Sequence, residues 1–301
     1  VEVLYTMMRL KWASPNHVFM TRGNHEDFRM TTLYGFVREG ELKYGRAFNP
    51  LAIWRTYDFL PVVLYLGVGS DYIQCNHGGM EPGYDPKSLL SSQQKVSCQL
   101  LGTLKQKTFM EKNTDWLKGE DASTKRMALA KLLDFKPQTP TQPAPIGFMW
   151  NDFFVFHDEP ALGFNPSRLA FNHGRASTAY LMRSASSPKA RLRAVFLAHQ
   201  QSSVPNPMMN RLLASNGAFR HWQDTDTMAK AALDKARLNT LVESTPQRSV
   251  PDGSVWTFNV APDSVYGEGN NYQFDSIGIL QTAAAFEDWR LKVVNVPVST
   301  R

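Results

Sequence analysis

The sequence contains very little cysteine, with only Cys75 and Cys98 among its 301 residues. Two cysteines are too few for a disulfide framework, and this count is typical of a reducing compartment, so we expect a cytoplasmic or nuclear location. Long apolar runs are also absent: no stretch approaches the roughly 18 residues of a membrane span, and no signal-peptide pattern opens the chain. These absences argue against a disulfide-rich secreted domain and against a membrane partner.

Blocks of one charge are absent as well. The formal net charge is +6, but the 33 Lys and Arg residues are scattered along the chain and form no single basic run. Because nucleic-acid-binding proteins concentrate positive charge on one patch, the sequence does not predict a nucleic-acid partner. The remaining composition, 43% hydrophobic and 20% charged, is that of an ordinary globular protein with enough residues for a large core.

What the sequence does contain is a series of short apolar runs that end in polar, metal-capable residues. Residues 17–21 (HVFMT) have the character of a buried strand, as do the runs within 71–79 and 193–201. The residues at their ends are Asn24 with His25, His77, and His199. Because ligands in α/β sheets bind beyond the carboxyl ends of strands, three such ends can converge on one point. Asparagine oxygen and neutral imidazole nitrogen are ligands for Zn, Fe or Mn; the alternative is that each histidine is an ordinary surface or core residue.

The middle of the chain has a different character. Residues 83–122 are polar and mixed, residues 123–135 have the pattern of a capped amphipathic helix, and residues 136–147 are rich in proline. We therefore predict a single domain over residues 1–301 in which residues 83–145 form an insertion or an elaborated segment. This segment is expected to lie outside the main sheets and to be more mobile than the strands.

Six short segments match, in order, the successive motifs of one enzyme family. They are RGNHE at 22–26, HGGMEP at 77–82, MWND at 149–152, RLAFNHG at 168–174, AHQ at 198–200 and APDSVYGEGNN at 261–271. In these motifs the sequence resembles the phosphoprotein phosphatase family of serine/threonine phosphatases, and the match spans almost the whole chain. The resemblance implies an α/β fold of the calcineurin-like metallophosphoesterase type, which is a β-sandwich of mixed sheets flanked by helices.

The resemblance also implies a metal-dependent hydrolysis of phosphomonoesters. Two divalent metals about 3.5–4 Å apart, such as Mn, Fe or Zn, hold a hydroxide that attacks phosphorus directly, without a covalent enzyme intermediate. By the resemblance, Asn24, His77 and His199 are ligands of one metal. His25 is the general acid that protonates the leaving serine or threonine oxygen, and Arg168 holds the phosphate.

Three further positions belong to the implied substrate cleft. Trp150 and Asp152 match a family motif beside the cleft, although a tryptophan after a proline-rich loop is equally compatible with a core position. Tyr266 lies in a loop that hangs over the active site in the family, and this loop is one residue longer here, which would displace the tyrosine. The implied partners are a phosphoserine or phosphothreonine protein substrate and regulatory subunits.

Two family motifs are missing. Family members begin with GD-x-H-G and GD-x-V-D-R-G, which supply ligands of the first metal and the aspartate that bridges both metals, and neither occurs here. Residues 1–20 resemble the helix and strand that follow the second motif, so we expect a fragment with at most one partial metal site and little or no activity. The alternative is an inactive pseudophosphatase that acts as a binding module. The joint presence of all five metal and phosphate residues favours the enzyme, and the coding sequence upstream of Val1 would decide.

Overall fold

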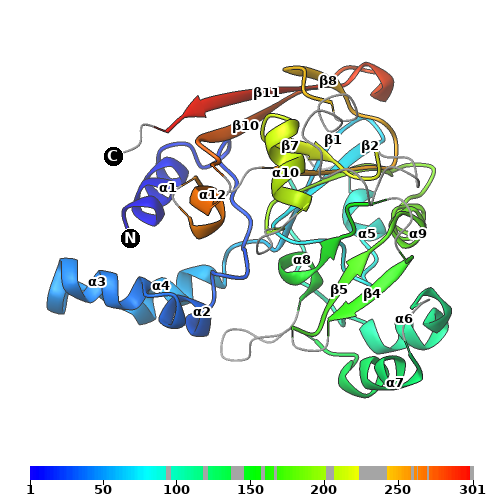
Figure 1. Ribbon diagram of the computed structural model, residues 1–301, viewed down its shortest axis with the longest axis horizontal. Coiled ribbons are helices and arrows are strands. Elements are labelled where there is room, and N and C mark those ends of the chain that lie inside the picture. Colours follow the sequence, from blue (N-terminus) through cyan, green and yellow to red (C-terminus); the bar gives the residue numbers. More distant parts are fainter. Residues whose placement is uncertain are drawn as a thin grey trace.

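The computed structural model describes most of the chain. The described residues are 1–92, 96–117, 121–136, 146–156, 160–165, 168–200, 207–223, 243–258, 261–262, 264–269 and 271–298. Figure 1 shows a central β-structure with a second sheet lying across it and helices on the outside. The chain therefore has a mixed α/β fold.

A five-stranded sheet forms the centre. Its strands, in order across the sheet, are β1 (Val63–Val68), β2 (Asp71–Asn76), β6 (Arg191–Leu197), β9 (Ser254–Phe258) and β7 (Ala218–Arg220). The three inner strands run parallel, and the two edge strands run antiparallel to their neighbours. Because the carboxyl ends of parallel strands meet at one edge of a sheet, the residues that follow β2 and β6 lie side by side. The N–H of Ala198 donates to the carbonyl of His77 at 3.0 Å.

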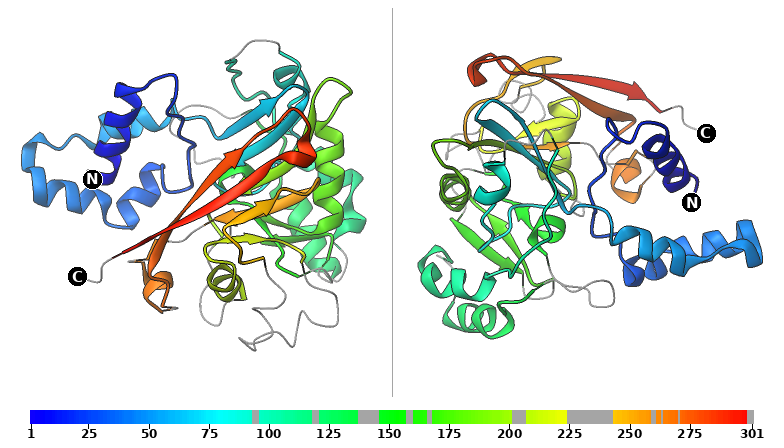
Figure 2. Two further views of the ribbon diagram at one scale, coloured as in Figure 1. Left: turned by 90° about the horizontal axis from the view of Figure 1, so that it is seen from above. Right: turned by 180° about the vertical axis from the view of Figure 1, so that it is seen from behind.

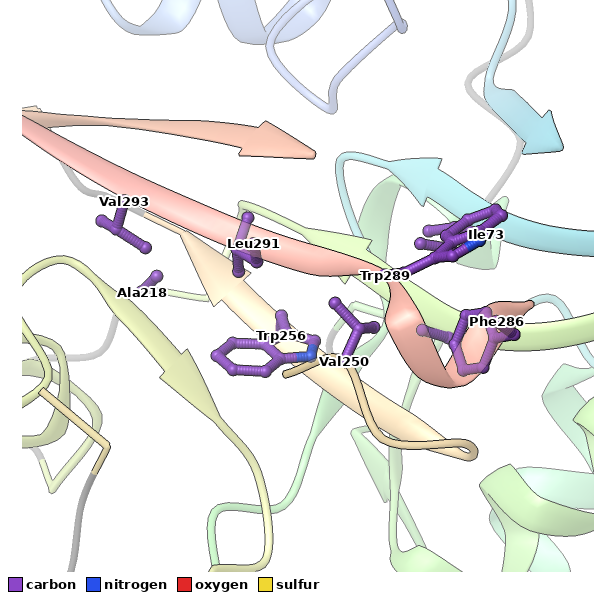
Figure 3. Packing of buried hydrophobic residues seen from close by; sticks show 9 residues of the cluster. Ile73, Ala218, Val250, Trp256, Phe286, Trp289, Leu291 and Val293 are labelled. Atoms are coloured by element: carbon purple, nitrogen blue, oxygen red, sulfur yellow. The ribbon is translucent and has the colours of Figure 1, made fainter. Parts of the chain in front are cut away.

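A three-stranded antiparallel sheet covers one face of the central sheet. Its strands, in order, are β10 (Phe274–Gln281), β11 (Arg290–Pro297) and β8 (Gln247–Ser249). Between the sheets lies a buried cluster in which Ile73 and Trp256 of the central sheet meet Leu291 of β11, all at 0% exposure (Figure 3). Burying a side chain of this size contributes about 1.5–3 kcal/mol, so this cluster holds the two sheets together as a sandwich.

The other face of the central sheet packs on helix α9 (Arg175–Ala185) and a small sheet. The strands of the small sheet, in order, are β3 (Asp152–Phe153), β5 (Ala170–His173) and β4 (Leu162–Asn165). Leu181 of α9 and Phe153 of β3 are buried against Val195 and Val255 of the central sheet. A mixed α/β fold with mixed sheets and flanking helices is what the sequence predicted, and the fold prediction is confirmed.

The remaining described elements are short. They are α5 (Lys87–Leu90), α8 (Gly147–Trp150), α10 (Pro207–Ala214), α12 (Val265–Gly269), and the 3₁₀ turns η1 (Gly45–Ala47), η2 (Thr114–Trp116) and η3 (Phe286–Asp288). Among the described helices, none is both long enough and apolar enough to serve as a transmembrane segment.

The middle segment is more firmly packed than a surface elaboration. Its helices α6 (Gln106–Lys112) and α7 (Ala122–Lys131) lie beside the small sheet and away from the sheet of β10 and β11 (Figure 1). Ala128 and Leu132 are buried at 0% and 1% exposure in a cluster with Phe171 of β5. A helix is present where one was expected, but it ends at Lys131 and not at residue 135. Residues 137–145 of the predicted proline-rich stretch lie outside the described residues.

The N-terminal quarter is helical and lies to one side of the sheets (Figure 2). Its helices are α1 (Glu2–Ala13), α2 (Phe28–Leu33), α3 (Phe36–Tyr44) and α4 (Pro50–Tyr57). The strand expected at residues 17–21 is not formed, and Phe19 is 44% exposed. The N–H groups of His17 and Val18 bond locally to the carbonyl of Ser14, whereas a strand requires a ladder of bonds to a neighbouring strand. The prediction of a buried strand there was wrong.

Candidate active site

Two histidines lie at the carboxyl ends of adjacent parallel strands. His77 directly follows β2, and His199 comes two residues after the end of β6. Their rings are 5.1 Å apart, centre to centre, and nearly perpendicular. The backbone of His199 has a φ of 42°, in the left-handed region that is unfavourable for a non-glycine residue. Strained backbone of this kind is concentrated at functional sites, where the surrounding structure enforces it.

Asn24 reaches the same point from the N-terminal quarter. Its side chain is buried, and its Oδ1 lies 2.9 Å from His77 Nε2. Two ligands that each sit about 2.0–2.2 Å from one ion are separated by roughly 3 Å, so this spacing is compatible with a shared metal ion. The loop is shaped by Glu26, whose Oε2 accepts from the N–H of Gly23 at 2.7 Å. A side chain at Gly23 would come within about 3.0 Å of the His77 ring, so only glycine permits this approach.

The two histidines next to Asn24 differ in their surroundings. Burial lowers the pKa of His77 to about 3, helped by His199 and His25, so its ring is neutral near pH 7 and keeps a lone pair for a ligand role. His25 is exposed and stacks 4.9 Å from the ring of Tyr34. Partial loss of hydration lowers the pKa of His25, while Glu26 raises it and His199 lowers it further. A bound phosphate dianion would raise it again, because an opposite charge favours the protonated ring.

Trp150, the last residue of α8, and Asp152, the first residue of β3, both lie beside His199. Asp152 Oδ1 accepts a hydrogen bond from His199 Nδ1 at 2.9 Å, and the His199 side chain is only 8% exposed. A carboxylate on one imidazole nitrogen fixes the ring and leaves the other nitrogen, Nε2, for a ligand or a proton. The ring of Trp150 lies 6.1 Å from that of His199, so Trp150 belongs to the site as well as to the packing of α8.

Arg168 lies at the edge of this arrangement. Its side chain is exposed and, with Asn24 and Trp150, lines one large open groove. Its backbone N–H donates to Asn165 Oδ1, at the end of β4, at 3.2 Å. Tyr266 falls in α12, but its side chain lies outside the described part, so its predicted place over the site stays a prediction.

The donor set fits one side of a single divalent ion. Two imidazoles and the amide oxygen of Asn24 are acceptable ligands for Zn, Fe or Mn, but all three are neutral. Within the described ranges, no group of three or more His, Cys, Asp or Glu side chains is arranged to hold a metal ion. The described residues therefore fit one incomplete metal site and do not fit a two-metal centre.

Sequence reasoning missed two buried asparagines that join the end of β2 and the loop after it to α8 and the residue that follows it. Asn76 Nδ2 donates to the carbonyl of Phe148 at 3.0 Å, and Asn151 Nδ2 donates to the carbonyl of Met80 at 2.7 Å. Both side chains are buried, and each bond spans about seventy residues of sequence. The only sequence signal was their place inside or beside the two motifs, because a polar residue next to a motif does not reveal its partner.

Three comparisons relate the chain to known proteins. Residues 1–127 match the family model of the calcineurin-like phosphoesterases. A segment of 64 residues, or 21% of this chain, is 44% identical to the serine/threonine-protein phosphatase rdgC of Drosophila melanogaster. A solved serine/threonine phosphatase of Saccharomyces cerevisiae, described as similar to human phosphatase PP5, superposes over 100% of this chain with a TM-score of 0.51 and 17% identity.

The first 127 residues are thus similar to the calcineurin-like phosphoesterases, and one segment is similar to a serine/threonine-protein phosphatase. The likeness to the yeast structure, at this identity, concerns the fold alone. The matched segment spans 10% of the rdgC chain, and the superposition spans 66% of the yeast chain. The structure brings Asn24 of the N-terminal loop, His77 after β2 and His199 after β6 to one location.

Proposed function

We propose that this chain is part of a metal-dependent protein serine/threonine phosphatase that hydrolyses phosphomonoesters by direct attack of water on phosphorus. The observation that carries the proposal is the meeting of Asn24 Oδ1 with His77 Nε2 beside the ring of His199. A divalent ion at these donors, Mn, Fe or Zn, would neutralise charge on the phosphoryl oxygens and activate the attacking water. The remaining chemistry falls to the protein's own side chains.

Each of the neighbouring residues has a place in that reaction. His25, exposed at the rim, donates a proton to the leaving serine or threonine oxygen once the phosphate has restored its charge. Arg168 on the groove wall binds the phosphate, for which its planar pair of donors is suited. Asp152 holds the His199 ring through Nδ1, and Trp150 closes one side of the site against water.

The test is steady-state hydrolysis of a phosphopeptide and of p-nitrophenyl phosphate with added Mn²⁺. In a chain that also carries the two missing motifs, His25→Ala should lower kcat for the phosphopeptide by roughly 10²–10⁴-fold, the usual contribution of a positioned general acid, and should affect the activated aryl ester less. His17→Ala is the matched control, because His17 is an exposed histidine outside the site. Equal losses for both variants, or for both substrates in His25→Ala, would contradict the role of His25.

A phosphate-binding module without turnover is the second candidate. It is favoured by the neutral donor set, because a metal held by neutral ligands alone is bound weakly and, within the described residues, no carboxylate completes the site. Calorimetry separates the two: a phosphopeptide that binds in a manner dependent on Arg168 while remaining intact over hours supports the module. A chain that carries the two missing motifs, compared with residues 1–301, would show whether restored ligands restore turnover.

The substrate, the partners and the cellular location are further parts of this proposal. We infer a phosphoserine or phosphothreonine protein as substrate and regulatory subunits as partners, in the cytoplasm or the nucleus. The two unpaired cysteines, Cys75 and Cys98, support a reducing compartment. We treat residues 1–301 as one catalytic domain in which residues 83–145 are an elaboration, and the buried cluster at Leu132 supports its being packed on that domain.

A further inference from the structure

A buried carboxylate lies beside the candidate active site. Glu81 is 3% exposed and comes four residues after His77. One of its oxygens accepts from Gln106 Nε2 at 2.7 Å, and the other accepts from the backbone N–H of Gly147. The N–H of Phe148 also bonds to the carboxyl group. Glu81 thus collects the backbone donors at the amino end of α8.

The loop that carries Glu81 is in direct contact with α8. A side chain at Gly78 would lie 2.7 Å from the backbone of Met149, and one at Gly79 would lie 2.9 Å from Asn151 Cβ. Only glycines let the helix rest on this loop. The N–H of Gly78 donates to the carbonyl of Phe148 at 2.7 Å, and the loop and α8 are therefore joined at Gly78 as well as at Glu81.

The chain runs from the end of α8 directly into the candidate active site. The helix ends at Trp150, and β3 begins at Asp152, whose carboxylate accepts from His199 Nδ1. The next residue, Phe153, is held by Gln200, which donates to its carbonyl and accepts from its N–H. A shift of α8 would therefore move Asp152 relative to His199, while Gln200 keeps the far end of the segment in place.

We propose that Glu81 is a positioning residue, which sets Asp152 and hence the orientation of His199 by fixing the amino end of α8. It touches neither substrate nor the proposed metal donors, and it acts through one helical turn. The consequence for catalysis rests on the proposed phosphatase function. The consequence for the His199 ring does not, and it can be measured in a protein without activity.

The readout is the His199 Nδ1–H signal in histidine-labelled ¹⁵N–¹H spectra, assigned by its loss in His199→Gln. We expect the signal to be kept in Glu81→Gln, because a glutamine oxygen can accept from Gly147 while its amide group donates to a reoriented Gln106. We expect it to shift or disappear in Glu81→Leu. Glu81→Asp, which withdraws the oxygens from α8 by one methylene, should act in the same direction and carries the test where Glu81→Leu does not fold.

Gln106→Leu is the matched control. Gln106 is as buried as Glu81, at 2% exposure, and its loss removes a hydrogen bond of the same carboxylate but leaves the bonds to α8. It should lower the denaturant midpoint without moving the His199 signal. An unchanged signal in both Glu81→Leu and Glu81→Asp, or an equal change in Gln106→Leu, would show that Glu81 is merely structural and would overturn the proposal.

Kinetics give the second readout. Glu81→Leu should lower kcat for p-nitrophenyl phosphate by about 10–100-fold with little change in KM, the range for residues that orient metal ligands, and Glu81→Gln should stay near the parent value. Absence of turnover in the parent would count against the proposed function alone. A loss of kcat in Glu81→Leu without a change in the His199 signal would overturn the positioning role.

Discussion

The helices before residue 60 and the sheets after residue 62 bury their apolar side chains to very different extents. In the first region Trp12, Leu42 and Phe59 are 87%, 78% and 86% exposed. In the second, large side chains such as Trp256 and Phe171 are at 0%. The fully buried members of the five described hydrophobic clusters all come from residue 73 onward.

The contrast shows that the N-terminal helices form although they bury few apolar side chains. Two of the four N-terminal helices have side-chain caps: Asp27 caps α2 by accepting from the N–H groups of Arg29 and Met30, and Asn49 caps α4 by accepting from the N–H of Ala52. Such caps stabilise a helix end by about 1 kcal/mol, whereas packing provides most of the stability of helices in proteins. The candidate active site spans both regions, with Asn24 on one side and the two histidines on the other.

The largest difference between the regions should appear on removing a tryptophan from each. Trp256→Ala should lower the free energy of unfolding by about 3–5 kcal/mol, because it empties the centre of the cluster between the two sheets. Trp12→Ala should change it by less than about 0.5 kcal/mol, because the side chain is 87% exposed. Urea unfolding followed by circular dichroism measures both. A comparable loss in Trp12→Ala would mean that α1 packs far more tightly than its exposure indicates.

A second comparison lies within two adjacent residues of the middle segment. Leu132→Ala should cost about 2–5 kcal/mol, because Leu132 is 1% exposed against Phe171 and the small sheet. Leu133→Ala is the control, since its side chain is 63% exposed, and should cost less than about 0.5 kcal/mol. Similar small values for both variants would restore the view that residues 83–145 are a dispensable surface addition.

The third test uses pH to probe the stability of the region after residue 62 alone. Burial raises the pKa of Glu81 to about 8 in the folded chain from its ordinary value of 4.5, so the folded state binds one more proton than the unfolded state between these values. Stability is therefore greatest below the lower pKa and is lost as the pH rises, with a slope of about −1.4 kcal/mol per pH unit.

The cleanest window for this test is pH 6.5 to 8. Burial lowers the pKa values of His173 and His221 to about 4, and these groups change stability only below about 6.5. Unfolding midpoints across the window should fall in the parent and stay flatter in Glu81→Gln. Parallel profiles would place the ionisation of Glu81 outside this range.

The smallest effect is expected from a helix cap in the N-terminal region. Asn49→Ala removes the bond to the N–H of Ala52 and should destabilise α4 by about 1 kcal/mol, which corresponds to about fivefold faster amide exchange within that helix. The unfolding midpoint of the sheets should not change. A drop in the midpoint equal to the local loss would show that the two regions unfold as one cooperative unit.

Several features could be predicted from neighbouring residues alone. The hairpin of β1 and β2 follows from two apolar runs joined at Gly69 and Ser70, with Gly69 at a φ of 60° that favours glycine. The rule that parallel strands share one carboxyl edge anticipates the meeting of His77 and His199. These predictions needed only the two-residue side-chain period of a strand, a turn signal and a motif.

Other features could not be read in this way. Residues 17–21 have the composition of a strand but bond to Ser14 as a turn, because strand formation depends on a partner that composition does not specify. The burial of Leu132 depends on strands thirty or more residues further along the chain. The hydrogen bonds of Glu81 to α8 depend on the backbone N–H groups of Gly147 and Phe148, more than sixty residues away.

The sequence by itself determined which chemistry the chain can offer: the metal-capable Asn24, His77 and His199, the acid candidate His25, and the family that its motifs resemble. Motifs carry this information because ligand and proton-transfer chemistry depends on residue type and on short spacing. Only the tertiary structure decided which of these side chains meet, that Asp152 holds His199, and that Glu81 fixes α8. Such contacts join segments far apart in the sequence, and their geometry depends on how the sheets and helices pack.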